Sequence, residues 1–268
     1  MGSAPTPILV STYGSGNSAD GAITRDYIDD LIAGMSSHLL IYLYAKKITP
    51  GTTAFVDRLG NTVTNATTGS TKNNSDSNFN GHASITFDNT NNPFTFAAGG
   101  IGIGTPPIAM TNSFTFMAGV RPSTSSSIQM LYGDTAGTSG SVSETVFYFD
   151  SSGDLRYAVG TSSYTNLGLL LAAGTTGVIW ISFDSATNIL RAGVNSTSIA
   201  LQATTTYNRT GAGTSTVCTP FGFPGGGGNS GYQGFNRWAL FNKAYMNGLV
   251  PSDDAAFSNL ISSYAEYL

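Results

Sequence analysis

The sequence has few charged residues and few of the residue types on which most catalytic sites depend. Only 10% of its residues are Asp, Glu, Lys or Arg, against roughly 25% in an average soluble domain. It has two histidines, His38 and His82, and its only glutamates are Glu144 and Glu266. Nucleophilic hydrolysis requires a base beside the nucleophile, and glycoside hydrolysis usually requires a pair of carboxylates. No motif of either kind is present, so we expect a protein that is not an enzyme.

Further absences exclude other classes of protein. Cys218 is the only cysteine, so no intrachain disulfide can form, and we interpret it as a small buried hydrophobe. The Lys and Arg residues are spread thinly and form no basic run, which argues against nucleic acid and against an anionic membrane surface as partners. The longest apolar stretches, such as residues 167–173, are too short to cross a bilayer. The first residues lack the basic and apolar regions of a signal peptide.

The residues that are abundant favour a turn-rich β protein. Hydrophobic residues make up 40% of the chain, and Gly accounts for 33 positions. Residues 113–122 alternate with period two, which predicts a strand with one aromatic-rich face. Many short strands separated by tight turns predict an all-β, two-sheet antiparallel β-sandwich. The other predicted strands are residues 39–44, 53–57, 83–88, 128–133, 144–150, 155–160, 178–184, 189–194, 198–203 and 235–241.

Helices are predicted near both ends of the chain. Residues 1–20 suggest an extended arm, and a helix over residues 24–36 follows, with Thr24 as its cap. The apolar stripe of this helix either packs on its own sandwich or docks on a neighbouring subunit; we assign residues 1–37 to docking and residues 38–268 to the sandwich. A closing helix is predicted from Ser252, and residues 64–80 are predicted to form a polar loop. The docking stripe consists of Tyr27, Ile28, Leu31, Ile32 and Met35.

Several segments resemble strands of the concanavalin A-like, laminin G-like and pentraxin-like jelly-roll domains. They are residues 113–122 (SFTFMAGVRP), 128–134 (IQMLYGD), 147–157 (FYFDSSGDLRY), 178–195 (VIWISFDSATNILRAGVN) and 235–246 (FNRWALFNKAYM). The resemblance spans roughly residues 38–268 and implies a lectin-like sandwich. Domains of this kind are common in bacteriophage virion structural proteins.

That resemblance, together with the missing catalytic motifs, predicts a non-enzymatic virion structural protein: a capsid decoration, head fibre or tail component. The expected location is the virion surface, outside the cell after lysis. The expected partners are other capsid or tail proteins, further copies of this chain as a homo-oligomer, and host-surface glycans. A carbohydrate-binding adhesin for receptor recognition is the alternative, and a divergent glycoside hydrolase is a third.

Two sets of residues are candidates for binding. Sugar recognition requires exposed aromatic rings and amide groups, which the sequence places in strand ends and loops; ordinary rim or subunit contacts are the alternative. The sugar-binding candidates are Tyr132, Tyr164, Tyr207, Asn229 and Tyr232. The resemblance also implies a loop calcium ion, for which Asp134, Asp150 and Asp154 are candidates, unless these residues only stabilise turns. We expect no other cofactor, and we expect Trp180 and Trp238 to lie in the core.

Overall fold

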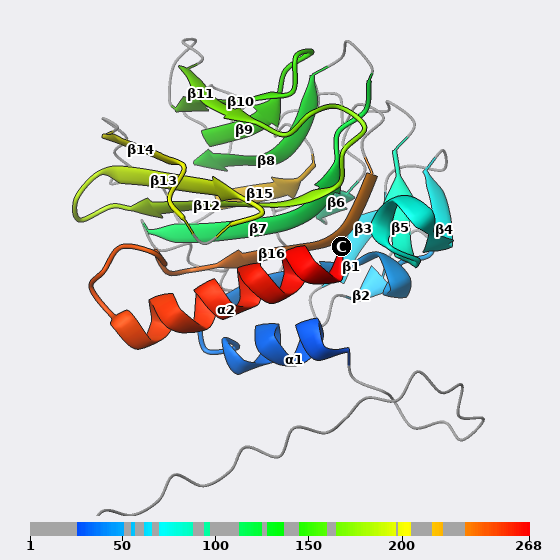
Figure 1. Ribbon diagram of the computed structural model, residues 1–268, viewed down its shortest axis with the longest axis horizontal. Coiled ribbons are helices and arrows are strands. Elements are labelled where there is room, and N and C mark those ends of the chain that lie inside the picture. The colour runs from blue at the N-terminus through cyan, green and yellow to red at the C-terminus, as the bar shows by residue number, and fades with distance from the viewer. Residues whose placement is uncertain are drawn as a thin grey trace, which may run out of the picture.

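The described part of the chain is built in three layers. In the computed structural model a five-stranded sheet packs on an eight-stranded sheet, and the two helices cover the outer face of the larger sheet (Figure 1). All strand pairs are antiparallel, which confirms the predicted two-sheet β-sandwich. Neither described helix is long and apolar enough to cross a membrane. The structure describes residues 26–50, 55–56, 62–65, 70–87, 94–96, 113–124, 128–136, 145–159, 165–196, 198–204, 216–221 and 234–268.

The eight-stranded sheet carries the helices and positions the site described below. Along one path its strands are β14 (Leu201–Thr204), β13 (Ile189–Val194), β12 (Gly177–Asp184), β7 (Phe114–Arg121), β16 (Gly234–Phe241), β5 (His82–Thr86) and β4 (Thr71–Asp76). The eighth strand, β1 (Leu39–Tyr44), also pairs with β16. β16 therefore contacts β7 along one edge and shares its other edge between β5 and β1.

The second sheet closes the sandwich, and a small third sheet lies beside the two. The five-stranded sheet runs in the order β11 (Thr165–Leu170), β10 (Asp154–Val159), β9 (Thr145–Phe149), β8 (Gln129–Ala136) and β15 (Thr216–Pro220). The three-stranded sheet contains β2 (Phe55–Val56), β3 (Thr62–Asn65) and β6 (Phe94–Phe96). Two short 3-10 turns, η1 (Ala45–Lys47) and η2 (Ser77–Phe79), adjoin β1 and β4.

The period-two pattern of β7 separates two hydrophobic cores. Its Phe116 and Val120 side chains lie in the core between the sheets, together with Trp238. Its Met117 side chain points to the opposite face and packs with Trp180 under the helices. Both tryptophans are fully buried, as predicted. Successive side chains of a strand point to opposite faces of its sheet. Because both faces of this sheet are covered, the alternating side chains of β7 enter two different cores.

The first helix, α1 (Tyr27–Gly34), packs on its own sandwich. Its cap is Asp26, whose carboxylate accepts a hydrogen bond from the Ile28 amide at 3.1 Å, so the helix begins later than Thr24. Ile28, Ile32 and Met35 are buried in the core beneath the helices. Leu31 is partly buried against this core, whereas Tyr27 is 50% exposed. The assignment of Ile28, Ile32 and Met35 to docking is therefore wrong, because side chains that are buried in their own subunit cannot contact a neighbouring one.

The second helix, α2 (Pro251–Tyr267), buries the predicted apolar stripe. Val250 is its N-cap and Pro251 occupies the first turn, so the helix begins one residue before the predicted cap, Ser252. Proline is well suited to this position because the first amide of a helix has no acceptor in any case. Phe257, Leu260, Ile261 and Tyr264 are all buried against the sheet.

One segment predicted to be a loop is a strand. Residues 64–80 were expected to be irregular because they contain almost only Thr, Asn, Ser and Gly, yet residues 71–76 form β4. β4 is an edge strand that pairs only with β5 along the path of its sheet, and most of its side chains face solvent. At such a position backbone pairing alone forms the strand, so polar side chains are tolerated.

Candidate functional site

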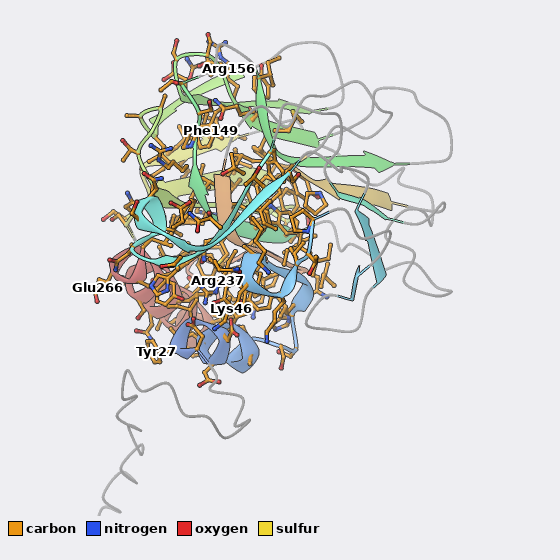
Figure 2. The ribbon with its side chains drawn as sticks, turned by 90° about the vertical axis from the view of Figure 1, so that its right-hand side faces the viewer. Tyr27, Lys46, Phe149, Arg156, Arg237 and Glu266 are labelled. Atoms are coloured by element: carbon orange, nitrogen blue, oxygen red, sulfur yellow. The ribbon has the colours of Figure 1, made fainter. Side chains whose placement is uncertain are left out.

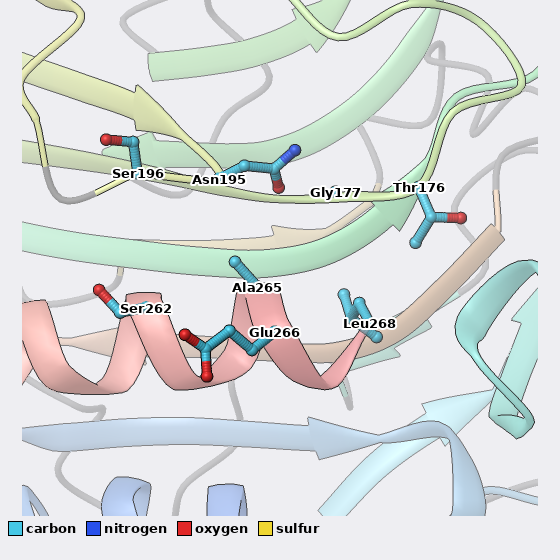
Figure 3. Close-up of a pocket in the computed structure, with 8 residues that line it drawn as sticks. All are labelled: Thr176, Gly177, Asn195, Ser196, Ser262, Ala265, Glu266 and Leu268. Atoms are coloured by element: carbon cyan, nitrogen blue, oxygen red, sulfur yellow. The ribbon is translucent and has the colours of Figure 1, made fainter.

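A polar pocket opens where the last turns of α2 meet the ends of β12 and β13. Figure 3 shows side chains from three segments around it: Ser262 and Glu266 come from the helix, Asn195 and Ser196 follow β13, and Thr176 precedes β12. Its volume is about 440 Å³, within the roughly 300–1,000 Å³ typical of small-molecule sites. The described residues that line it are Thr176, Gly177, Asn195, Ser196, Ser262, Ala265, Glu266 and Leu268.

Helical spacing sets the polar wall of the pocket. Ser262 and Glu266 are four residues apart on α2, so their side chains lie one above the other on the same face. The opposite face of the helix is buried through Leu260, Ile261 and Tyr264. That burial fixes the rotation of the helix and leaves Ser262 and Glu266 exposed. Ala265 and Leu268 add an apolar edge.

The sheet side of the pocket depends on a close approach between Asn195 and Gly177. Asn195 has a left-handed backbone, with φ of 51°, and its Oδ1 accepts a hydrogen bond from the Val178 amide at 2.7 Å. A Cβ atom on Gly177 would lie 2.7 Å from that Oδ1. Only glycine therefore leaves room for the amide, whose Nδ2 faces no hydrogen-bond partner among the described residues.

The chemical groups of the pocket suit a neutral, hydroxyl-rich ligand. Glu266 is the only residue with a charged side chain among the described residues that line the pocket, and it offers acceptor oxygens only. The Asn195 amide can donate from Nδ2, and the Ser262 hydroxyl can both donate and accept. None of the described lining residues has an aromatic ring, and Ala265 and Leu268 are the apolar side chains among them that can contact the apolar face of a ligand.

A second polar cluster lies deeper, around Arg237 on β16. Figure 2 shows Arg237 inside the molecule, whereas Glu266 and Tyr27 lie at its periphery. The Arg237 guanidinium donates to Asp26 Oδ2 at 2.6 Å and to Asn236 Oδ1 at 2.6 Å. It also lies 3.5 Å from Asp29 Oδ1. This cluster therefore joins the N-cap of α1 and α1 itself to the central strand β16.

Tyrosine rings complete this cluster and make it a structural one. Tyr42 donates to Asp29 at 2.5 Å, and Tyr267 donates to Asp26 at 2.6 Å. The Arg237 guanidinium lies 4.0 Å from the centre of the Tyr44 ring. Burial raises the pKa of Tyr42 and Tyr267 far above the ordinary value, although nearby Arg237 lowers it in part. These hydroxyls stay protonated at neutral pH and serve as hydrogen-bond donors, whereas a nucleophile would need the phenolate.

The predicted sugar-binding residues do not form this pocket. Tyr132 is fully buried between the sheets and stacks on Phe116 with ring centres 5.4 Å apart. The prediction that its ring is available to a sugar is therefore wrong: it lies on the inward face of β8, although its position in the sequence suggested a strand end. Tyr164, Tyr207, Asn229 and Tyr232 lie outside the described residues.

The three candidate calcium ligands are not gathered into one site by the part of the chain that is described. Asp150 forms an ion pair with Arg156 at 2.5 Å and accepts hydrogen bonds from two amides of its own hairpin, those of Ser152 and Asp154. Asp154 accepts a hydrogen bond from Asn166. Asp134 pairs through its backbone with β9 and β15. Within the described residues, no group of three or more His, Cys, Asp or Glu side chains could hold a metal ion. Asp150 thus stabilises its own turn, whereas the Asp154 side chain contacts Asn166 on the neighbouring strand β11.

Sequence reasoning missed the residues of the pocket because they are ordinary when each is taken alone. Glu266 was considered only as a carboxylate outside any catalytic motif. Asn195 and Ser196 belong to the hairpin that resembles the jelly-roll pattern, but nothing in the sequence places that hairpin beside the end of α2. The Asn195-Ser196 pair at the end of a predicted strand is the one available signal, because Asn is favoured where a left-handed residue is required.

The fold is similar to part of known sialidases. No protein-family model matches the sequence, and neither does any curated protein. Trypanosoma rangeli sialidase in complex with 2,3-difluorosialic acid aligns with 85% of this chain and 33% of its own, at 11% identity and a TM-score of 0.58. The same enzyme with sialic acid gives 12% identity and a TM-score of 0.56 over the same shares of the chains. The NanB sialidase from Streptococcus pneumoniae aligns with 50% of this chain, at 16% identity and a TM-score of 0.42.

These comparisons correct the functional prediction. The Trypanosoma matches establish a shared fold, and the chain corresponds to about a third of the length of those sialidases. The expectation of a non-enzymatic virion structural protein is wrong, because the matched proteins are glycoside hydrolases and nothing in them points to a phage structural protein. The absence of paired carboxylates in the sequence was too weak a basis for excluding an enzyme, since sialidases use a tyrosine nucleophile.

Proposed function

We propose that this chain is a carbohydrate-binding β-sandwich that serves glycoside-hydrolase chemistry, with the pocket between α2 and the β12–β13 ends as its sugar site. The observation that carries the proposal is the pocket itself: a carboxylate, an amide and a hydroxyl, from Glu266, Asn195 and Ser262, surround a cavity of about 440 Å³. The fold shared with T. rangeli sialidase supports it. The resemblance of the strand pattern to concanavalin A-like and laminin G-like domains, which are lectin-like, supports it as well.

The pocket offers the groups that sugar recognition requires. A sugar ring presents hydroxyls that both donate and accept, so it needs acceptors and donors together. Glu266 supplies the acceptors, and Asn195 Nδ2 and Ser262 supply donors. The Asn195 side chain is held in place by the Val178 amide, so little conformational entropy is lost when a ligand binds to it.

Binding to a glycan panel tests the proposal. The panel contains neutral and sialylated oligosaccharides and is probed with the full chain, with Asn195→Ala and with Ser262→Ala. A matched control, Ser152→Ala, removes a hydroxyl from the exposed β9–β10 hairpin of the other sheet. We expect at least one class of glycan to bind, and we expect both pocket variants but not the control to weaken it. A blank panel, or binding that neither pocket variant alters, would overturn the proposal.

Glycoside hydrolysis by this chain is a second candidate, favoured by the sialidase matches. Release of a fluorescent aglycone from a sialoside and from neutral glycosides is the direct measurement. Turnover that disappears in Glu266→Gln would place the reaction at the pocket. Turnover that survives this change would place it elsewhere in the chain, and no turnover on any substrate would count against this candidate.

A further inference from the structure

The electrostatic character of the pocket determines which sugars it can take. We infer that the pocket accepts uncharged sugar units, such as neutral hexoses and N-acetylhexosamines, and rejects units that carry a carboxylate, sialic acid included. This inference rests on the proposed function, because it names the class of ligand for the same site. It goes against the simplest extrapolation from the sialidase matches, which is a site for the anionic sugar itself.

The described lining of the pocket is negatively charged. Glu266 is the only ionisable side chain among the described residues that line it, and none of these residues is Lys, Arg or His. Three described basic residues form ion pairs away from the pocket: Arg237 with Asp26, Lys243 with Asp253 and Arg156 with Asp150. A ligand carboxylate in this pocket would meet a like charge, with no compensating cation among the described lining residues, and like charges at close range repel each other.

The direction of α2 adds to the negative character of the pocket. The pocket lies against the C-terminal turns of this helix, where Ala265, Glu266 and Leu268 form part of its wall. The C-terminal end of a helix carries a partial negative charge, because its last carbonyl groups lack partners within the helix. The last turn of α2 contains no basic residue to offset it. The helix end and Glu266 therefore both disfavour a negatively charged ligand in the pocket.

The same features favour hydroxyl groups. A carboxylate can accept two hydrogen bonds side by side, one on each oxygen, which suits two neighbouring hydroxyls of a neutral sugar ring. Hydrogen bonds to a charged acceptor are stronger than those between neutral groups. Ala265 and Leu268 lie beside this polar wall and can cover the C–H face of the same ring.

Titration calorimetry with a matched pair of ligands tests the inference. The pair is lactose and 3′-sialyllactose, which differ by one sialic acid unit, and the full chain is compared with Glu266→Gln. Asp154→Asn is the control, because it removes one negative charge from β10 on the other sheet. In the unmodified chain we expect lactose to bind at least about tenfold more tightly than 3′-sialyllactose. Glu266→Gln should weaken lactose binding about tenfold and reduce the preference for lactose over 3′-sialyllactose. Asp154→Asn should change neither the affinity for lactose nor this preference.

The outcomes separate the two proposals. Equal or tighter binding of 3′-sialyllactose by the unmodified chain would overturn the inference and leave the proposed function standing. An unchanged preference in Glu266→Gln, or the same change in Asp154→Asn, would also overturn it, because discrimination would then not depend on the pocket carboxylate. Binding of neither ligand overturns the inference, and the wider glycan panel then decides the proposed function by itself.

Discussion

Arg237 donates a hydrogen bond to Asp26 at 2.6 Å across 211 positions of the sequence. The bond joins the middle of β16 to the residue that caps α1. Arg237 is fully buried and Asp26 is mostly so, with 21% of its side chain exposed. The first residue of the described chain is thus joined to strand β16 by a charge pair inside the molecule, and α1 is an integral part of the fold.

Replacing Arg237 should be severely destabilising. Arg237→Met removes the positive charge that pairs with the buried Asp29 carboxylate and the partly buried Asp26 carboxylate. Breaking a buried ion pair on one side typically costs about 3–5 kcal/mol. We expect a loss of this size in the free energy of unfolding, measured by urea denaturation. A loss below about 1 kcal/mol would mean that the cluster does not hold α1 to the sandwich.

The stability of the protein should decrease in acid because of Asp26. Burial raises the pKa of Asp26, but Arg237, Tyr267 and the Ile28 amide together lower it below its ordinary value of 3.8. A carboxyl whose pKa is lowered in the folded state stabilises the fold fully above its unfolded pKa, and this contribution is lost as the pH falls through the folded value. We expect the melting temperature to fall below about pH 4. In Asp26→Asn the melting temperature should depend less on pH below about pH 4. The same pH dependence in that variant would show that Asp26 is not the cause.

Gly119 should not tolerate alanine, because α2 packs directly on it. A Cβ atom there would meet the Tyr264 hydroxyl and ring and also Leu268, and Tyr264 is fully buried. Overpacking of a core typically costs about 1–3 kcal/mol, so we expect Gly119→Ala to lower the melting temperature. Gly34→Ala is the control: nothing lies within 4 Å of its added methyl group, so it should be neutral or slightly stabilising. Equal effects of the two changes would argue against close packing of the helix.

Arg191 should be replaceable without loss of stability. It lies on β13 and is 8% exposed, and its Nη1 is buried with no hydrogen-bond partner among the described residues. A buried donor without a partner costs about 1–3 kcal/mol, and an apolar group of similar shape can remove that cost. We therefore expect Arg191→Met to be neutral or stabilising in urea denaturation, in contrast to Arg237→Met. Destabilisation above about 1 kcal/mol would show that the Arg191 charge is needed where it lies.

Local pattern in the sequence predicted much of the sandwich. β1 and β13 have the predicted bounds, and most other predicted strands are within a few residues of theirs. The missed strands are β3, β4, β6, β11 and β15. Two described examples give the reason: β4 is polar because its side chains face solvent, and Thr165–Leu170 contains Gly168 with φ of 66°, which interrupts an alternating pattern.

The candidate site was much less predictable than the fold. Tyr132 was chosen as an exposed ring, yet the pairing of β8 with β9 turns it into the core. Glu266 lies on the exposed face of α2 and belongs to no sequence motif. It became a candidate only because it lines the same pocket as Asn195. No spacing rule connects those two residues, which are 71 positions apart by their numbers.

The sequence by itself determined the β class, the period-two alternation of β7, and the stripe that makes α2 amphipathic. These features follow from the repeat of the backbone, two residues for a strand and 3.6 for a helix, so neighbouring residues suffice to specify them. Only the tertiary structure decided that α1 packs on its own subunit, that Arg237 joins Asp26, and that Glu266 shares a pocket with Asn195. Each of these depends on which distant segments become neighbours, and that is set by the packing of both sheet faces at once.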